Sequence, residues 1–306
     1  MITQNILIIY NPNSGKGRGE RFANRLQRAL TKRKYTVGEV FRSDSTERVY
    51  EFCEASTGNP KEFSMAIIIG GDGTLSPWVD AMIKNNFRVP VYAFGRGTAN
   101  DFSAFLRTCR SIRKVCKIIK KGQVVEMDTL HINNESFGMN VACGGAFTNG
   151  VTAYSKRGKL VFGKLAYMYK AMGAAIRMRA QDVRFTVDGR EIQASVYLFL
   201  ILNSPNAGSI RRISRTARPW SGEFELVAIK RCGFWGKMGL ALYGLFGWLS
   251  KNKHVVCRTG KEFTVEVVGE PNRNFTKTDI DGNKGGDYPL HVRVSDEKIP
   301  FVTNRW

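Results

Sequence analysis

Five consecutive small or polar residues, Gly70-Gly71-Asp72-Gly73-Thr74, directly follow a short apolar run, Met65 to Ile69. A short apolar run that ends in glycines is typical of a buried strand in a parallel sheet. Glycine lacks a Cβ and reaches positive φ freely, so successive backbone N–H groups of this turn can point at one anion. Residues Leu75 to Lys84 have helical spacing, which predicts a helix N-terminus at the same point. The order of strand, glycine turn and helix predicts a nucleotide site, and a purely structural connection is the alternative.

Two further junctions have the same pattern. The segment Asn11 to Gly17 follows the apolar run Ile6 to Tyr10, and the segment Gly95 to Phe102 follows the run Val89 to Phe94. In an alternating β/α region such loops meet at the carboxyl ends of parallel strands, where open α/β sheets bind their ligands. One binding site built from three loops is the simplest interpretation.

The three loops resemble the catalytic core of the diacylglycerol kinase, sphingosine kinase and ceramide kinase family, especially its compact bacterial lipid kinases. The resemblance extends from Ile6 to about Val294, with order and spacing maintained throughout. Asp128, together with the segment Phe137 to Ala142, looks like the aspartate and following strand of that family. The segment Asp281-Gly282-Asn283 looks like its late Asp-Gly-Glu motif.

The resemblance implies an enzyme that uses ATP and Mg²⁺, with Asp281 as the base near the acceptor hydroxyl and with Asp72 and Asp128 near the metal. Nucleotide binding is expected from Asn11, Pro12, Asn13, Ser14, Gly15, Lys16, Ser43, Gly70, Gly71, Asp72, Gly73, Thr74, Gly97, Thr98 and Asn100.

Each aspartate also has a structural interpretation. Asp72 is suited to a turn in which it bonds its own backbone. Asp101, which belongs to the third loop, is as well suited to capping the helix predicted over Ser103 to Leu106 as to a role in the binding site. The acid-rich segment Asp279 to Asn283 is suited to a hairpin turn.

The chain departs from the family pattern at two places. Asn283 stands where the family usually has glutamate, and an amide cannot carry the charge that would hold Mg²⁺ or act as a base. Between Ile213 and Val227 the family usually has a pair of acids that hold a structural magnesium, whereas this chain has Trp220 and Ser221. We therefore expect no magnesium at that second position.

The pattern of apolar runs and turn residues along the sequence predicts an α/β plus β-rich fold with two lobes and a cleft between them. Residues 1–128 alternate apolar runs with amphipathic segments such as Arg18 to Arg33, which indicates an α/β nucleotide-binding domain. Residues 129–295 contain short strand-like runs separated by turns such as Asp188-Gly189, which indicates a β-sandwich-like domain for the lipid substrate. Two helical segments interrupt it, Gly163 to Arg179 and Phe234 to Ser250. Residues 296–306 are expected to pack back on the first domain.

The net charge of +21 comes from 47 Lys and Arg against 26 Asp and Glu, and it is unevenly distributed. Residues 136–261 contain 20 basic and 5 acidic residues, a net charge of +15. Such a field attracts an anionic membrane leaflet or nucleic acid, and a solvated basic surface is the plain alternative. The sequence contains no run of about 20 apolar residues and no secretory signal, so we expect a cytoplasmic protein with peripheral membrane association. The six cysteines lack metal-ligand spacing, which predicts reduced thiols.

The segment Phe234 to Ser250 is rich in aromatic residues and is flanked by Lys230, Arg231, Lys251 and Lys253. This composition fits an interfacial helix, but a helix buried against the β-rich lobe is the commoner outcome for an aromatic stripe. The basic cluster Arg211 to Trp220 is a second candidate for contact with lipid phosphate.

The sequence thus predicts a lipid kinase that transfers the γ-phosphate of ATP to a lipid hydroxyl at an anionic membrane surface, with diacylglycerol as the favoured acceptor. A catalytically impaired lipid- or nucleotide-binding module and, as the weaker candidate, an NAD kinase stay open as alternatives. The choice between a monomer and a homodimer also stays open, and no specific nucleic-acid motif accompanies the basic charge.

Overall fold

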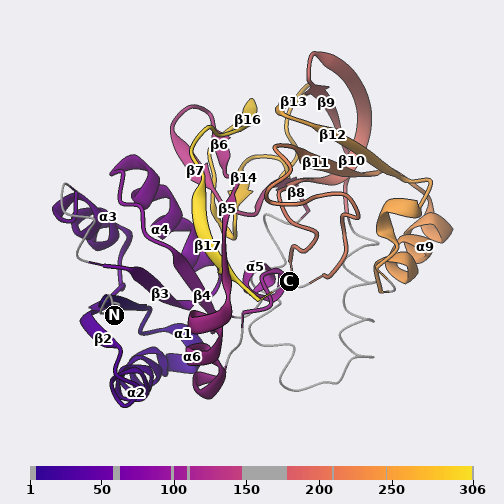
Figure 1. Ribbon diagram of the computed structural model, residues 1–306. Coiled ribbons are helices and arrows are strands. Elements are labelled where there is room, and N and C mark those ends of the chain that lie inside the picture. Colours follow the sequence, from indigo (N-terminus) through magenta and orange to yellow (C-terminus); the bar gives the residue numbers. More distant parts are fainter. Residues whose placement is uncertain are drawn as a thin grey trace. The chain divides into compact units, whose positions relative to one another are not determined.

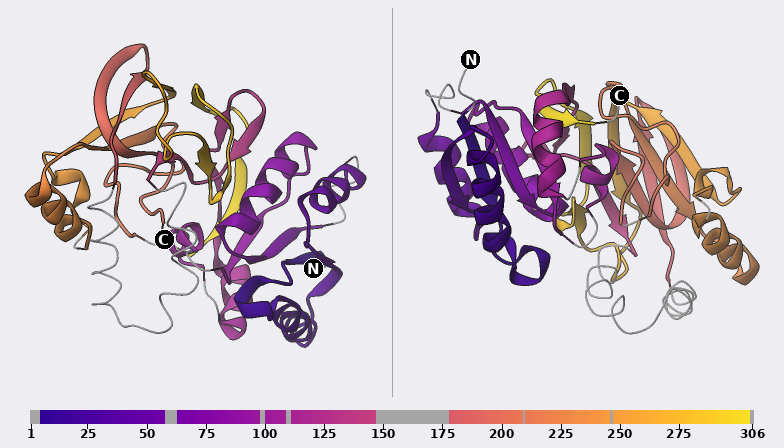
Figure 2. Two further views of the ribbon diagram at one scale, coloured as in Figure 1. Left: turned by 180° about the vertical axis from the view of Figure 1, so that it is seen from behind. Right: turned by 60° about the horizontal axis from the view of Figure 1, so that its bottom comes forward.

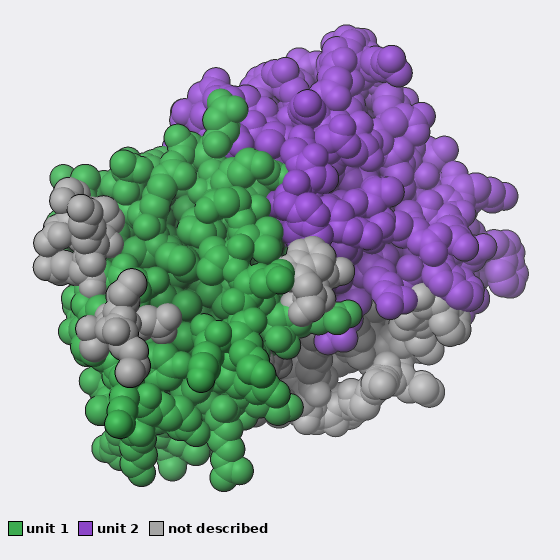
Figure 3. Space-filling view, viewed as in Figure 1, with its two compact units in different colours: residues 1–129, 296–306 green, residues 130–295 purple. Residues whose placement is uncertain are grey.

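The computed structural model describes residues 5–57, 63–97, 100–108, 111–146, 178–208, 210–245 and 247–304. The chain divides into two compact units, of which unit 1 comprises residues 1–129 and 296–306 and unit 2 comprises residues 130–295 (Figure 3). Each unit has a sheet of its own.

Unit 1 is built on a six-stranded sheet in the order β2-β1-β3-β4-β17-β5 (Figure 1). Strands β1 to β4 and β17 run parallel, and β5 pairs antiparallel with β17. Its elements are β1 (Asn5–Tyr10), α1 (Ser14–Gly17), α2 (Gly19–Thr31), β2 (Thr36–Arg42), α3 (Thr46–Ala55), β3 (Met65–Gly70), α4 (Asp72–Lys84), β4 (Val91–Gly95), α5 (Asp101–Phe105), α6 (Ile112–Lys121), β5 (Gln123–Met127) and β17 (Ile299–Thr303).

The central strands of this sheet are buried because helices cover both faces (Figure 1). On one face α2 and α6 contribute Leu26, Leu30 and Val115 to a core with Ile8 and Ile67 of the strands. On the other face α3 and α4 pack together. Apolar runs that are buried on both faces are typical of a parallel sheet in an α/β unit, so the predicted α/β fold of this region is confirmed.

Unit 2 is built on an eleven-stranded sheet whose paired strands run antiparallel. Among the residues of unit 2 that the structure describes, the helices are α9 (Phe234–Leu245) and the 3₁₀ turn η2 (Leu249–Lys251). Its strands are β6 (Leu130–Ile132), β7 (Ser136–Gly138), β8 (Val141–Gly145), β9 (Gln181–Val187), β10 (Arg190–Leu202), β11 (Phe224–Lys230), β12 (Val255–Gly260), β13 (Glu262–Val267), β14 (Thr278–Ile280), β15 (Asn283–Lys284) and β16 (Leu290–Val294).

The sheet of unit 2 curls around a core rich in phenylalanine (Figure 2). Phe185 and Phe199 meet edge-on with ring centroids 5.7 Å apart, and Phe275 is fully buried beside them. The long strand β10 pairs with β8, β9 and β11. This arrangement confirms the predicted β-rich second lobe.

Some predicted helices differ from the observed ones. Helix α4 begins at Asp72, three residues before the start that the apolar spacing predicted, so Gly73 and Thr74 lie in its first turn. The predicted segment Phe234 to Ser250 forms two elements, α9 and η2, while the helix expected over residues 163–179 lies almost wholly outside the described residues. Of the helices that the structure describes, none combines the length and the apolar character needed to span a bilayer.

Candidate functional site

The loops that follow β3 and β4 touch through two glycines, Gly71 and Gly97. A Cβ placed on Gly97 would lie 2.4 Å from the Cα of Gly71, and a Cβ on Gly71 would lie 2.7 Å from the Cα of Gly97. Real Cβ atoms do not approach backbone so closely, so any other residue at either position would push the two loops apart. The two backbones therefore cross at a point where side chains are excluded.

Backbone and side-chain hydrogen bonds tie the loop after β1 to the same place. Asn11 donates from Nδ2 to Thr74 Oγ1 at 3.3 Å, and Gly15 donates its N–H to the carbonyl of Arg96 at 2.9 Å. Arg96 in turn donates its N–H to the carbonyl of Gly70 at 2.6 Å. The structure thus brings the three sequence-predicted loops together at the carboxyl ends of β1, β3 and β4.

The segment from Gly70 to Thr74, all of which the structure describes, does not use the positive φ that glycine allows. Gly71 has φ −102° and occupies the N-cap position of α4, and its lack of a Cβ is what the contact with Gly97 requires. Gly70 is needed for a related reason, because a Cβ there would lie 2.5 Å from the Cβ of Thr74. Positive φ occurs instead after β1, at Gly15 (61°) and Gly17 (74°).

The carboxylate of Asp72 connects two helix starts. Its Oδ2 accepts the N–H of Asp101 at 2.8 Å and its Oδ1 accepts the N–H of Phe102 at 3.2 Å. The partners of these two hydrogen bonds lie about 30 residues along the chain, so Asp72 connects its own loop to the loop after β4. Asp101 is the first residue of α5, while Asn100 occupies the cap position with a left-handed φ of 55°.

Asn100 closes its own loop and is buried. Its Oδ1 accepts the N–H of Gly97 at 2.6 Å, and its Nδ2 donates to the carbonyl of Gly97 at 2.7 Å. Thr98, which the sequence assigned to nucleotide binding, lies outside the described residues, as does the side chain of Lys16. The amide of Asn100 holds Gly97 in the position where it meets Gly71.

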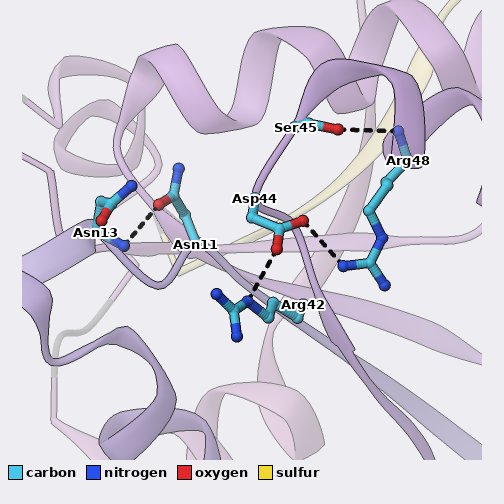
Figure 4. Close-up of polar contacts among 6 residues, drawn as sticks. All are labelled: Asn11, Asn13, Arg42, Asp44, Ser45 and Arg48. Carbon is cyan, nitrogen blue, oxygen red and sulfur yellow. Dashed lines mark hydrogen bonds and ion pairs between the residues drawn. The ribbon is translucent and has the colours of Figure 1, made fainter.

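In the loop after β1, Asn13 donates its N–H to Asn11 Oδ1 at 2.9 Å (Figure 4). Pro12 is half-buried and Ser14, buried, begins the short helix α1. The side chain of Asn11 therefore links the backbone of its own loop to Thr74 of the next.

Ser43 follows β2 and lies beside the end of β1, because its N–H donates to the carbonyl of Tyr10 at 2.8 Å. Its hydroxyl is buried and accepts the indole N–H of Trp78 at 3.0 Å. This contact gives Ser43 a packing role in addition to the predicted nucleotide role.

Next to Ser43 lies a charged cluster that the sequence interpretation missed (Figure 4). Asp44 pairs with Arg42 and with Arg48, each at 2.9 Å, and Ser45 caps α3 by accepting the N–H of Arg48. Desolvation is the largest single influence on the pKa of Asp44 and raises it, but the hydrogen bond and charge of Arg48, a backbone hydrogen bond and the charge of Arg42 together hold that pKa below its usual value. The available signal was the run of charged and hydroxyl residues after β2, which follows the pattern of the other loops.

Asp128 lies after β5 and is buried. Lys298, just before β17, places its Nζ 2.8 Å from Asp128 Oδ1. The side chain of Asp128 is inaccessible to solvent while that of Lys298 is 41% exposed. The lysine therefore supplies positive charge at the carboxylate that the resemblance assigned to magnesium.

Asp281 belongs to unit 2 and is buried at the tip of the β14–β15 hairpin. Its φ is 54° and that of Gly282 is 85°, and Ile280 pairs with Asn283 across the turn. An Asp-Gly pair with positive φ at both positions is the favoured two-residue hairpin turn, so the hairpin interpretation of this segment is confirmed. The turn also positions the aspartate side chain.

The carboxylate of Asp281 accepts three backbone N–H groups from the connection between β7 and β8. Met139 donates to Oδ2 at 2.7 Å, and Asn140 and Val141 donate to Oδ1 at 2.9 and 2.8 Å. Such bonds are stronger to an ionised carboxylate than to a neutral acceptor. They fix the side chain in one orientation.

A buried network of amides and a hydroxyl adjoins this carboxylate. Asn203 donates to the carbonyl of Met139 at 2.8 Å, and Asn140 donates to the carbonyl of Asn206 at 2.9 Å. The hydroxyl of Ser204 donates to Asn140 Oδ1. The sequence interpretation missed Asn203, Ser204 and Asn206, although they follow the apolar strand β10 as small polar residues follow β1, β3 and β4.

Asp279 lies in the same hairpin as Asp281 and is also largely buried. Burial raises the pKa of Asp279 to about 6, the N–H of Gly282 at 2.8 Å opposes this shift, and the charge of Asp281 adds to it. The hairpin therefore carries two acids in different environments.

A further buried acid lies in the segment from Ile213 to Val227, where the resemblance implies a structural magnesium site. Glu225 of β11 accepts hydrogen bonds from the hydroxyls of Ser214 and Thr216. Among the described residues no group of three or more His, Cys, Asp or Glu side chains could hold a metal ion.

Comparison with known proteins shows that two protein families match this chain. Residues 5–132 match the diacylglycerol kinase catalytic domain family, and residues 141–303 match the YegS C-terminal NAD kinase beta sandwich-like domain family. A diacylglycerol kinase of Staphylococcus carnosus (strain TM300) is 27% identical over 296 residues, covering 97% of this chain and 94% of that protein. One of Bacillus subtilis (strain 168) is 26% identical over 301 residues, covering 95% and 96%.

The fold is similar to that of a solved structure as well. A crystal structure of a diacylglycerol kinase from Bacillus anthracis str. Sterne matches with a TM-score of 0.75 and 18% identity, covering all of this chain and 99% of that one. At this identity the likeness concerns the fold. The two domain matches account for nearly the whole described chain, and this protein belongs to the diacylglycerol kinase family with a catalytic domain followed by a YegS-type β-sandwich-like domain.

Proposed function

We propose that this chain is a lipid kinase that transfers the γ-phosphate of ATP to a lipid hydroxyl at a membrane surface, with diacylglycerol as the first acceptor to test. The observation that carries the proposal is the contact of Gly71 with Gly97 at the N-terminus of α4. The names of the relatives support the choice of diacylglycerol.

The residues of unit 1 fit a nucleotide phosphate. The first N–H groups of a helix have no acceptor inside the helix, and the excluded side chains at Gly71 and Gly97 let a phosphate reach them. The side chains of Asn11 and Thr74, joined at 3.3 Å, border the same point. When bound there, ATP supplies the phosphoryl group, and these residues would hold its phosphates.

The residues also fit Mg²⁺ that is bound mainly through water and phosphate. Magnesium keeps several waters and takes few carboxylates, and the described residues offer no cluster of three or more acids, histidines or cysteines. Asp72 would contribute a carboxylate, because its side chain lies at the first turn of α4, beside the proposed phosphate site, where two backbone N–H groups hold it in place. Asp128 would contribute the second. Bound Mg²⁺ would offset phosphate charge.

Asp281 would accept the proton of the lipid hydroxyl or orient that hydroxyl for attack. Its three backbone donors hold the carboxylate in one orientation, which a positioned base requires. Asn283 favours a competing proposal, a binding module without catalysis, because the family's glutamate is absent. Turnover separates the two.

The test is incubation of the purified protein with γ-labelled ATP, Mg²⁺ and mixed anionic vesicles that carry single candidate lipids. The variant Asp281→Asn is assayed beside Asp188→Asn, a matched control in the other Asp-Gly hairpin, where Asp188 Oδ1 accepts the N–H groups of Lys261 and Glu262 at 2.9 Å. We expect Asp281→Asn to lower kcat about 100-fold or more and Asp188→Asn to leave it within about twofold.

Three outcomes are distinguishable. Labelled diacylglycerol from the wild type establishes the kinase. Label on another lipid retains the kinase and changes the acceptor, while ATP binding without any labelled lipid favours the inactive module. Substantial turnover by a folded Asp281→Asn protein would contradict the assignment of the base and leave the kinase assignment in place.

A further inference from the structure

The exposed large hydrophobic side chains of the described chain concentrate on one short segment. Six such residues are exposed, and apart from Val124 all come from α9 and the turn after it. We call these five the α9 surface: Phe234, Trp235, Leu242, Tyr243 and Trp248, with exposed fractions of 53%, 83%, 54%, 37% and 50%. Aromatic side chains dominate the set, so of the two alternatives for this segment the exposed one holds at these positions.

Buried residues of α9 and η2 pack the α9 surface against the sheet of unit 2. Leu240 of α9 and Leu249 of η2 are buried in a cluster with Leu200 and Val227 of the sheet. Trp248 donates its N–H to the carbonyl of Tyr243 at 2.9 Å, which ties the turn to the helix. Leu240 therefore anchors one side of α9, while Trp235 and Leu242, seven residues apart, share another side.

Helix α9 lies at the outer edge of unit 2, beyond the strands, in each of the views (Figures 1 and 2). Trp235 and Phe234 meet edge-on with ring centroids 5.5 Å apart. An exposed aromatic pair at a domain edge costs solvation free energy unless a partner covers it. The exposure therefore calls for an occupant.

The sequence around the α9 surface carries positive charge only. Residues 226–261 contain seven Lys and Arg and no Asp or Glu. Lys251 lies over the ring of Trp248 with its Nζ 5.9 Å from the centroid. The basic segment at Arg211 and Arg212 borders the same turn, because a Cβ on Gly247 would lie 3.3 Å from Arg212 Cβ.

We infer that the α9 surface inserts into the headgroup region of an anionic phospholipid bilayer. Tryptophan and tyrosine prefer that depth, where their rings are apolar and their N–H or O–H groups are solvated, and Lys and Arg reach lipid phosphates beside them. This inference rests on the proposed function only for the choice of a bilayer as the partner of the α9 surface. Vesicle binding itself needs neither ATP nor turnover.

The test is sedimentation of the full chain with vesicles of phosphatidylcholine alone or with phosphatidylglycerol added, in the absence of ATP. We expect binding to the anionic vesicles that weakens with salt, and a loss of about tenfold or more in the double variant Trp235→Ser/Leu242→Ser. Val124→Ser, which removes an exposed large hydrophobic residue of unit 1, is the matched control and should bind as the wild type does.

Tryptophan fluorescence gives a second measurement. On anionic vesicles we expect a blue shift and quenching by brominated lipids that the variant Trp235→Phe/Trp248→Phe abolishes. Equal binding by wild type and Trp235→Ser/Leu242→Ser, with both folded by circular dichroism, would overturn the inference. So would a concentration-dependent dimer that the double variant disrupts, because a second copy would then be the occupant.

Failure of the inference is separable from failure of the proposed kinase. A short-chain diacylglycerol that is soluble as monomers removes the need for a surface, so Trp235→Ser/Leu242→Ser should keep wild-type turnover on it. Vesicle binding without any turnover would retain the α9 surface and refute the kinase. Turnover on the soluble lipid without vesicle binding would refute the α9 surface alone.

Discussion

The carboxylate of Asp72, the first residue of α4, accepts the N–H of Asp101, the first residue of α5, at 2.8 Å. One side chain thereby fixes the position of two helix starts that follow adjacent strands. A residue that holds the loops together also shapes any phosphate site that the loops form, so its replacement should change both stability and nucleotide affinity.

Asp72→Asn should lower the free energy of unfolding by about 1–3 kcal/mol, because an amide places a donor where the carboxylate accepted two N–H groups. Urea denaturation measures this change, and Asp80→Asn, which alters an ion-paired acid in the same helix, is the control. If Asp72 also engages magnesium, the affinity for MgATP should fall further than the affinity for ATP without metal. An equal fall in the two would contradict the metal assignment.

Gly97→Ala should abolish tight ATP binding, with a loss of affinity of about tenfold or more, because its methyl group would meet the Cα of Gly71 and separate the loops. Isothermal titration calorimetry on the folded variant measures the loss. Gly233→Ala is the matched control, since no atom lies within 4 Å of the Cβ it would add. Wild-type affinity in Gly97→Ala would show that nucleotide binds elsewhere.

Lys298→Met should destabilise the protein by about 3–5 kcal/mol, since it leaves Asp128 buried without the cation 2.8 Å away. The control Lys277→Met breaks a pair with Asp287, whose side chain is 71% exposed, and should cost less than about 1 kcal/mol. If Asp128 binds magnesium, adding Mg²⁺ should restore part of the stability of Lys298→Met and none in the control. A melting temperature insensitive to Mg²⁺ would argue against Asp128 as a ligand.

Asp279→Asn should stabilise the protein at alkaline pH and lose that advantage in acid. Burial raises the pKa of Asp279 from 3.8 to about 6 in the folded state, so the folded protein binds the proton more tightly than the unfolded chain does. The charged form therefore opposes folding above about pH 6, and this opposition disappears as the pH falls through about 6 toward 4. Thermal melts of wild type and variant across this range test the sign, and a constant difference between them would contradict it.

The sequence predicted the α/β class of the first region, the β-rich class of the second and the meeting of three loops, because each depends on local patterns. The apolar run Met65 to Ile69 predicts its own burial, and Gly70 to Thr74 marks the junction that follows. The reason for the glycines could not be predicted, since the contact between Gly71 and Gly97 depends on the register of β3 with β4.

Long-range polar contacts could not be predicted from local sequence patterns either. The donors to Asp281 lie about 140 residues earlier in the chain, and nothing near Met139 or Asn140 indicates a carboxylate partner. The exposure of Trp235 was also undecided, because an aromatic stripe has the same sequence pattern whether it faces a sheet or solvent. In both cases tertiary packing decides the outcome.

The position of strand β17 late in the sequence affects how the sheet of unit 1 is completed during synthesis. It lies between β4 and β5 in the sheet of unit 1, yet residues 299–303 are translated after all of unit 2. While the ribosome is still making unit 2, β4 and β5 lack this neighbour, and the loop that carries Gly97 follows a strand with an open edge. The loops after β3 and β4 of a nascent chain therefore reach their final support only when residues 299–303 emerge, and a chain that stops before residue 299 leaves that edge unpaired.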